Sequence, residues 1–188
     1  MMKFSSANDM LSKKNKFLKI SLLFFFLLFL SVLHLACAQK ETPKSSLIIK
    51  NNLLYKNGSD APFTGTEKAL VNNKIIEYEV KDGLKHGYFR IYSLDGNVEI
   101  QGQIDSNRNV GKWQYFYPNG TIESEGNFNF DLPEGRWIWN YPDGKLKEDG
   151  VYKNGERVGV WYQYDNNGVI INKRDYDNIN VVKDSSEI

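Results

Sequence analysis

Few side chains in this 188-residue sequence could carry out catalysis. His86 could serve as a general base, and a pair of carboxylates among Glu123, Glu125, Glu148 and Asp149 could act in glycoside hydrolysis if two of them faced each other across a cleft. His86 occupies a place that valine or glutamate fills elsewhere in the chain, and the carboxylates fall on predicted strands of an open sheet. We therefore predict no catalytic residue and no enzymatic activity.

Metal and cofactor chemistry is also poorly represented. Cys37 is the only cysteine, so the chain beyond it can form neither a disulfide nor a thiolate metal site. Asn119-Gly120-Thr121 matches a glycosylation acceptor, and Asp or Asn precedes glycine in several turns, but turn chemistry explains both patterns without a carboxylate-rich calcium loop. We predict no metal site and no cofactor.

The aromatic side chains have the greatest potential for binding. A single sheet has no second layer, so aromatic rings on it must bury one another, and we expect Trp113, Trp137 and Trp161 to form this core. Rings outside the core could offer a flat surface to a sugar, a peptide or another protein. The candidate binding aromatics are Tyr115, Trp139, Tyr162 and Tyr164.

A repeat of 24 residues must position these side chains. Its markers are three series of glycines: Gly87, Gly111, Gly135, Gly159; Gly96, Gly120, Gly144, Gly168; and Gly102, Gly126, Gly150. A fixed period of this length is typical of stacked supersecondary units. Each unit is an aromatic run that ends in a glycine turn, followed by a second strand and a further turn such as Asn154-Gly155. This pattern predicts an all-β fold, an elongated single-layer antiparallel meander of repeated β-hairpins.

Turn position also predicts the pairing of strands. A two-residue loop at Asn119-Gly120, with positive φ at both residues, would make the numbers of facing residues sum to 239. The predicted pairs are Tyr117 with Ile122, Trp113 with Gly126, Gly111 with Phe128, Trp137 with Gly150, Gly135 with Tyr152, and Phe89 with Gly102. In this register each ring would lie over the glycine opposite it, so the recurring glycines would serve packing. Pro118 instead suits a wider type I turn with a bulge.

The periodicity weakens toward both ends of the chain. We divide it into a signal segment at 1–37, a tether at 38–53, a repeat domain at 54–176 and a tail at 177–188. The repeat domain contains a degenerate unit at 54–86 and repeats at 87–110, 111–134, 135–158 and 159–176. Arg174 stands at the place of the third glycine opposite Trp161, where its guanidinium could cap the last indole by a cation–π contact.

The N-terminal segment predicts export. Basic residues precede the apolar run 20–33, which is short for a membrane span, and small residues follow it. Ala36-Cys37-Ala38 could be a signal peptidase I site, releasing a soluble secreted or periplasmic protein that begins at Gln39. Leu35-Ala36-Cys37 resembles the end of a bacterial lipobox, which would leave Cys37 as a lipidated N-terminus. We favour the lipoprotein, because the residues after Cys37 are polar and unpatterned, as a tether should be.

Charge excludes one class of partner. The first 19 residues hold five of the 24 Lys and Arg residues and one of the 23 acids, so residues 38–188 carry 19 cations and 22 anions, a net charge of −3. This balance is not that of a nucleic-acid-binding domain, and we predict no nucleic-acid partner.

The pattern Gly-x-Trp-x-x-Tyr-x-x-x-Gly, followed by an apolar residue, glycine, an aromatic residue and Asn-Gly, resembles the bacterial variant of the MORN repeat over about residues 54–176. The segment from Tyr55 to Gly65 is similar to the opening of YwqK-family antitoxins. The resemblance implies an elongated single-layer sheet and no catalytic residues.

Three functional hypotheses follow. The first is an exported module, tethered to the membrane by lipid at the cell envelope, that binds or scaffolds proteins. The second is a module that binds carbohydrate or the cell wall through aromatic rings. The third is an antitoxin of a toxin–antitoxin pair, which would require the signal segment to remain uncut.

Overall fold

The structure is a computed structural model that describes residues 43–178. Cys37, the signal segment and most of the predicted tail lie outside these residues. The described part consists of 12 antiparallel strands without a helix, which confirms the predicted fold class. The strands are β1 (Leu47–Lys50), β2 (Leu53–Lys56), β3 (Gly65–Val71), β4 (Lys74–Lys81), β5 (Leu84–Tyr92), β6 (Val98–Asp105), β7 (Arg108–Phe116), β8 (Ile122–Asn129), β9 (Leu132–Asn140), β10 (Leu146–Lys153), β11 (Glu156–Tyr164) and β12 (Ile170–Asp175).

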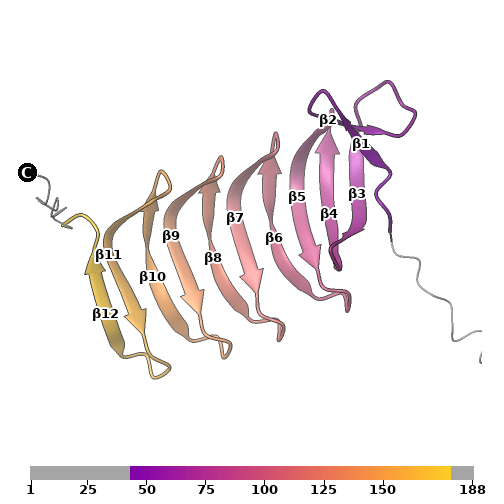
Figure 1. Ribbon diagram of the computed structural model, residues 1–188. Helices are drawn as coiled ribbons and strands as arrows, with labels where there is room; N and C mark the ends of the chain where they lie inside the picture. The colour runs from indigo at the N-terminus through magenta and orange to yellow at the C-terminus, as the bar shows by residue number, and fades with distance from the viewer. Residues whose placement is uncertain (1–42, 179–188) are drawn as a thin grey trace, which may run out of the picture. The chain divides into compact units, whose positions relative to one another are not determined.

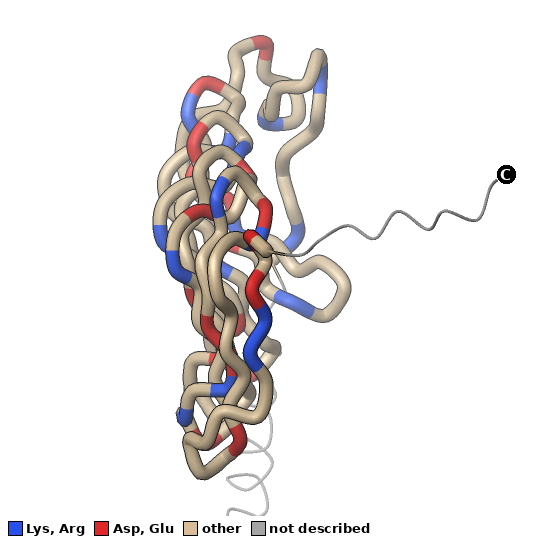
Figure 2. The backbone as a smooth tube through the Cα atoms, turned by 90° about the vertical axis from the view of Figure 1, so that its left-hand side faces the viewer, with Lys and Arg blue, Asp and Glu red and all other residues tan. Residues whose placement is uncertain are grey.

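Ten strands form one meander. From β3 to β12, each strand pairs with the strands before and after it in sequence, while β1 and β2 form a separate hairpin (Figure 1). The sheet is a single layer when viewed edge-on (Figure 2). The hairpin and its turn occupy residues 47–56, within and just after the expected tether. Backbone hydrogen bonds from Leu54 N to Gly83 O (2.9 Å) and from Gly83 N to Phe63 O (2.8 Å) attach residues 54–63 to the turn between β4 and β5.

Two kinds of turn alternate along the sheet. The turns at the upper edge in Figure 1 have two residues, both with positive φ, such as Asn154 (51°) and Gly155 (86°). Such turns match the right-handed twist of a hairpin. At the lower edge the β3–β4 turn is also of this kind, with positive φ at Asn72 and Asn73, but from β5 onward the loops there are longer. In the β7–β8 loop, Tyr117 N donates to Thr121 O and Gly120 N donates to Tyr117 O. Gly120 has a φ of 84°, but Asn119 does not have a positive φ, so the expected two-residue loop is wrong and the wider turn that Pro118 suits is present.

The predicted register is correct except next to this loop. Trp113 faces Gly126, Gly111 faces Phe128, and the corresponding pairs at Trp137, Gly135 and Phe89 are also present. Ile122 pairs with Phe116 rather than with Tyr117, because a bulge near Glu123 compensates for the longer loop.

The tryptophan rings cover different glycines from those predicted. A Cβ on Gly126 would lie 2.1 Å from the Trp137 ring, and one on Gly102 would lie 2.2 Å from the Trp113 ring. Each indole therefore leans over the glycine of the preceding repeat, not the one it faces. Trp113 Nε1 donates to Gln103 O at 3.1 Å, where a register shift between Gln101 and Gln103 interrupts the β6–β7 ladder. Trp137 Nε1 and Trp161 Nε1 donate in the same way to the carbonyl oxygens ten residues earlier in the sequence, Asn127 O and Val151 O.

The other glycine series serve the backbone rather than the rings. Gly111 has a φ of 61°, and a Cβ there would meet only the Gln103 Oε1 atom, at 3.4 Å. Only the series Gly102, Gly126 and Gly150 provides space for indole rings. The expectation that both glycine series within the strands serve packing is therefore wrong for Gly111, Gly135 and Gly159, because positive φ explains them.

Aromatic rings form the core of the sheet on one face, here called the tryptophan face. Trp113, Phe128, Trp137, Tyr152 and Trp161 follow one another in edge-to-face contacts with centroids 5.0–6.0 Å apart. Contacts of this kind contribute about 0.5–1.5 kcal/mol each beyond area burial. The three tryptophans are only 2–5% exposed, so the rings bury one another without a second layer.

The cation on the last tryptophan is not the predicted one. Arg174 faces Trp161 in the register, but its guanidinium lies over the Tyr176 ring, at 4.9 Å. Arg157 instead covers the Trp161 ring, at 3.9 Å. The indole leans toward β10, away from β12, so the guanidinium that reaches it comes from the start of its own strand.

Candidate functional site

The face opposite the tryptophans is mainly polar, and one row of side chains crosses it from β3 to β12. Its members face one another directly in the register: Lys68, Glu77, Arg90, Gln101, Gln114, Glu125, Ile138, Asp149, Tyr162 and Lys173. We call this set the central row. It combines both charges, amides and one tyrosine, and the aliphatic side chain of Ile138 interrupts it between Glu125 and Asp149.

Hydrogen bonds link the middle of the central row. Gln101 Nε2 donates to Gln114 Oε1 (2.9 Å), and Gln114 Nε2 donates to Glu125 Oε2 (2.8 Å). Lys112 Nζ lies 2.9 Å from the same Glu125 oxygen. Burial by itself would raise the pKa of Glu125, but the hydrogen bonds from Gln114 and Lys112 outweigh it and hold this pKa below its usual value. The Glu125 carboxylate therefore holds the side chains of Gln114 and Lys112 in place on this face of the sheet.

The carboxylates considered for catalysis are not brought together. Glu148 faces Trp139 on the tryptophan face, whereas Asp149 faces Ile138 on the other side of the sheet. Asp149 accepts two hydrogen bonds from Arg136, at 3.1 and 2.7 Å. Glu148 Oε1 lies 2.9 Å from Arg157 Nη1 without meeting hydrogen-bond geometry. These carboxylates belong to ion pairs and do not form a facing pair.

His86 lies near the upper edge, where its Nδ1 is 3.1 Å from Asp105 Oδ1. Both side chains are more than two-fifths exposed. Among the described residues 43–178, no group of three histidine, cysteine, aspartate or glutamate side chains could hold a metal ion. Within the same range, no helix is long and apolar enough to cross a membrane.

Two of the four candidate binding aromatics are on the tryptophan face. Trp139 packs against Trp137 (5.8 Å), Trp161 (5.6 Å) and Tyr152 (6.5 Å), so its ring is part of the aromatic core. Tyr115 is half-buried on the same face, and burial raises the pKa of its hydroxyl. Neither ring is left as a free stacking platform.

The other two aromatics are adjacent on the opposite face, at the C-terminal end. The Tyr162 and Tyr164 rings are 6.4 Å apart and tilted by 37°. Lys173 Nζ lies 5.9 Å above the Tyr162 ring, and the Tyr164 hydroxyl donates to Asp149 Oδ1 at 3.1 Å. We call Tyr162, Tyr164, Leu146 and Lys173 the tyrosine patch. The four predicted aromatics therefore occupy two faces and form no single site.

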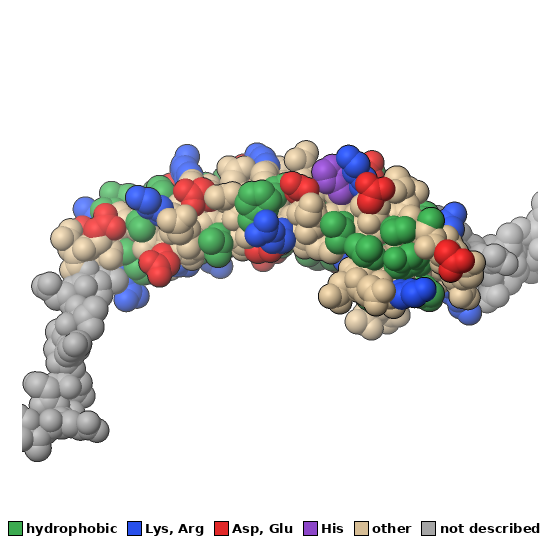
Figure 3. All heavy atoms as spheres, turned by 90° about the horizontal axis from the view of Figure 1, so that it is seen from above, with side chains coloured by type: hydrophobic (Ala, Val, Ile, Leu, Met, Phe, Trp, Pro, Cys, Tyr) green, Lys and Arg blue, Asp and Glu red, His purple; other side chains and the backbone are tan. Residues whose placement is uncertain are grey.

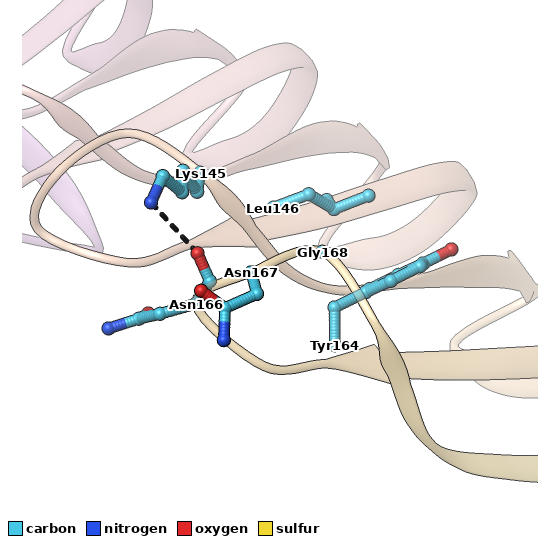
Figure 4. A pocket seen from close by; sticks show the side chains of 6 residues that line it. All are labelled: Lys145, Leu146, Tyr164, Asn166, Asn167 and Gly168. Carbon is cyan, nitrogen blue, oxygen red and sulfur yellow. Dashed lines mark hydrogen bonds between the residues drawn. The ribbon is translucent and has the colours of Figure 1, made fainter.

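A hollow of about 520 Å³ adjoins the tyrosine patch, and the sequence did not predict it (Figure 4). Its lining residues are Lys145, Leu146, Tyr164, Asn166, Asn167 and Gly168. Lys145 Nζ donates to Asn166 O at 2.8 Å, which joins the two loops that border the hollow. The sequence signal was slight: Asn-Asn-Gly replaces the Pro-Asn-Gly or Pro-Asp-Gly of the two preceding units.

Exposed aliphatic side chains continue from the tyrosine patch onto the last strand. Val169, Ile170 and Ile171 are 59%, 52% and 63% exposed. Charges of both signs lie along the upper edge of the sheet, and hydrophobic side chains also gather toward its N-terminal end (Figure 3). The C-terminal end thus combines tyrosines, a hollow and adjoining aliphatic side chains, as protein-binding surfaces do.

The hairpins match a known repeat. The family model described as "MORN repeat variant" matches residues 109–129, 133–154 and 157–178. Each match covers one hairpin, β7–β8, β9–β10 or β11–β12. Three consecutive hairpins of this chain thus match the MORN repeat variant. Comparison with curated proteins gave no match.

Two solved structures show a weak likeness. A chain of the Glycosylation Associate Protein (Gap123) complex from Streptococcus agalactiae is 14% identical, with a TM-score of 0.33 over 66% of this chain and 22% of that one. A chain of accessory secretory protein 1, 2 and 3 from Streptococcus pneumoniae is 14% identical, with a TM-score of 0.18 over 75% of this chain and 21% of that one. This chain spans about a fifth of either, and the likeness assigns no function.

Proposed function

We propose that this protein is a non-catalytic, exported repeat module, anchored to the envelope by a lipid on Cys37, that binds another protein through the tyrosine patch. The observation that carries the binding proposal is the position of Tyr162 and Tyr164, adjacent on the polar face and beside an open hollow. Tyrosine is favoured at interfaces because its ring supplies apolar area while its hydroxyl keeps a hydrogen bond.

The arrangement of the other aromatics favours a protein partner over a glycan. A glycan-binding surface needs accessible rings at repeat intervals, and Tyr115 and Trp139 are the two candidate rings that stand 24 residues apart. Trp139 contacts three other rings of the core, and Tyr115 is half-buried. Among the described residues, Tyr162 and Tyr164 are the one pair of adjacent tyrosine rings. A single tyrosine pair beside the hollow at Tyr164 fits a localised contact with a protein better than a regular array of sugar subsites.

The N-terminal sequence supports the envelope location. A basic flank, an apolar run and Leu35-Ala36-Cys37 stand in the order of a lipoprotein signal. One acyl chain gives marginal membrane binding, whereas the several chains of a bacterial lipoprotein hold it firmly. The tyrosine patch begins more than a hundred residues after Cys37 in the sequence and lies near the β12 edge of the sheet, whereas the chain enters the sheet at the β3 edge.

Palmitate labelling tests the anchor. The full chain and a Cys37→Ala variant are expressed side by side, and the mature N-terminus is determined by mass spectrometry. We expect label that depends on Cys37 and a mature chain that begins at this residue. An unlabelled chain beginning at Gln39 would show a soluble secreted protein, and an intact signal segment would exclude export and favour the antitoxin hypothesis.

A further inference from the structure

The two edges of the ten-stranded sheet are different. At the N-terminal edge, residues 43–46 run beside β3: Leu70 N donates to Pro43 O at 2.6 Å, and Ser46 N donates to Glu67 Oε1 at 3.3 Å. At the C-terminal edge, no strand among the described residues 43–178 pairs with the outer side of β12. An open edge presents backbone donors and acceptors to any extended chain.

The open strand also carries apolar side chains. Ile170 and Ile171 are more than half exposed, and Val169 precedes them in the turn. Single exposed aliphatics are ordinary, but consecutive ones on an unpaired strand are typical of a pairing surface. Lys173 and Arg174 follow, and their charges limit which strand can lie opposite.

We propose that β12 pairs antiparallel with β12 of a second copy of this chain, joining two sheets into one across a two-fold axis centred on Asn172. A two-fold axis perpendicular to the sheet keeps the tryptophan faces of the two copies on the same side of the joined sheet. The axis then passes through a pair of facing residues, so one residue of β12 lies opposite the same residue of the second copy. Centring on Lys173 or Arg174 would place like charges opposite each other, which is destabilising. Centring on Ile171 would also avoid like charges, but Ile171 is the bulged residue of the β11–β12 ladder, so the regular part of β12 favours Asn172. Centring on Asn172 places Ile171 opposite the second copy's lysine at position 173.

Asn172 is suited to this central position. Its Nδ2 donates to Gln163 Oε1 at 3.1 Å, and an amide retains further donor and acceptor capacity. Two amides facing each other across the axis are complementary, since each group offers both a donor and an acceptor. Asn172 also lies on the tryptophan face beside Gln163, so the pair adds no unpaired charge to the interface.

Such an assembly would close at two copies. The interface is isologous, and residues 43–46 cover the edge at which a third copy would have to attach. Pairing one short strand buries less than a typical stable interface, so we expect a weak dimer with a dissociation constant on the order of micromolar. The axis would put both tyrosine patches on the same face of the joined sheet. The dimer does not depend on the proposed partner of that patch.

Disulfide trapping tests the register in the full chain. Facing residues have Cα atoms about 4.5–5.5 Å apart, a separation that a disulfide spans. Under mild oxidation we expect a covalent dimer from Asn172→Cys and little from Ile171→Cys or Lys173→Cys alone, while a mixture of the latter two should cross-link. The unsubstituted chain, which retains Cys37, is the background control. Adding Ile171→Lys to Asn172→Cys should lower the dimer yield at least tenfold, because two lysines would then face each other.

Three outcomes would overturn the proposal. The first is equal cross-linking of the three single variants, which would indicate random collision. The second is no dimer from Asn172→Cys, or a dimer only after deletion of residues 179–188, which would show that this tail occupies the edge. The third is a disulfide from Asn172→Cys to a different protein, which would identify β12 as a partner's site.

Discussion

At the scale of single residues, the space over one glycine decides where an indole can lie. Gly126→Ala would place a Cβ 2.1 Å from the Trp137 ring, so the ring or the strand must move. We expect a loss of about 1–3 kcal/mol in the free energy of unfolding, the usual cost of overpacking. Urea denaturation followed by tryptophan fluorescence measures it.

Double variants identify the ring concerned. The cost of Gly126→Ala should shrink in a Trp137→Leu background, which removes the colliding ring, and persist in a Trp113→Leu background. If only Trp113→Leu reduced the cost, the ring facing Gly126 would be the one that clashes, and the observed lean of the indoles would be contradicted.

Backbone strain at one turn gives a second prediction at this scale. Phe130 has a φ of 46°, where the equivalent Asn154 has 51°. Asparagine tolerates this left-handed region better than phenylalanine does. Phe130→Asn should therefore raise the free energy of unfolding by about 0.5–1 kcal/mol despite loss of the Arg108 stacking contact at 4.2 Å.

Phe130→Ala is the matched control, because it removes the same ring and leaves a residue unsuited to positive φ. We expect this variant to be less stable than Phe130→Asn in thermal melting. Equal stability of the two would show that the turn stores no strain that asparagine relieves.

At the scale of strands, the central row predicts a pH dependence. The pKa of Glu125 is lowered in the folded protein, from an ordinary value of 4.5. Its stabilising contribution is therefore complete above about that pH and is lost as the pH falls through the lowered pKa. Glu125→Gln should reduce stability at pH 6, and this difference should shrink as the pH falls below 4.5 toward 3.

Chemical denaturation at the two pH values measures this effect. Glu123→Gln is the control, since Glu123 is exposed in the neighbouring bulge. A stability difference between wild type and Glu125→Gln that is the same at pH 3 as at pH 6 would mean that the charge of Glu125 contributes nothing to folding.

The strand scale also shows what could be predicted from sequence. The 24-residue spacing predicted the meander and most pairs, because a pairing register follows once the turns are located. It did not predict which neighbour an indole covers, since Trp113 lies between Gly102 and Gly126 and the choice depends on a ladder irregularity near Gln103. The Asn119-Gly120 pair was also predicted to have positive φ at both residues, but only Gly120 does.

At the scale of the described sheet, the aromatics of the core lie on the tryptophan face, and the aromatics proposed to bind a partner lie on the opposite face. Alternation along a strand puts Tyr162 and Tyr164 on one face, as they are in the structure, but it does not show that Trp139 is packed between the rings of two repeats. The hollow beside Tyr164 depends on two loops 21 residues apart in sequence, Lys145 and Asn166, and no local pattern predicts their contact.

The proposal that the tyrosine patch binds a protein is tested most directly by photo-crosslinking in cells. A benzophenone amino acid replaces Tyr162 in the full chain, and the control carries it in place of Tyr115 on the opposite face. We predict one discrete protein adduct in the membrane fraction from position 162, none from position 115, and loss of the adduct when Cys37→Ala is added. The same adducts from both faces, or none from position 162, would contradict the account.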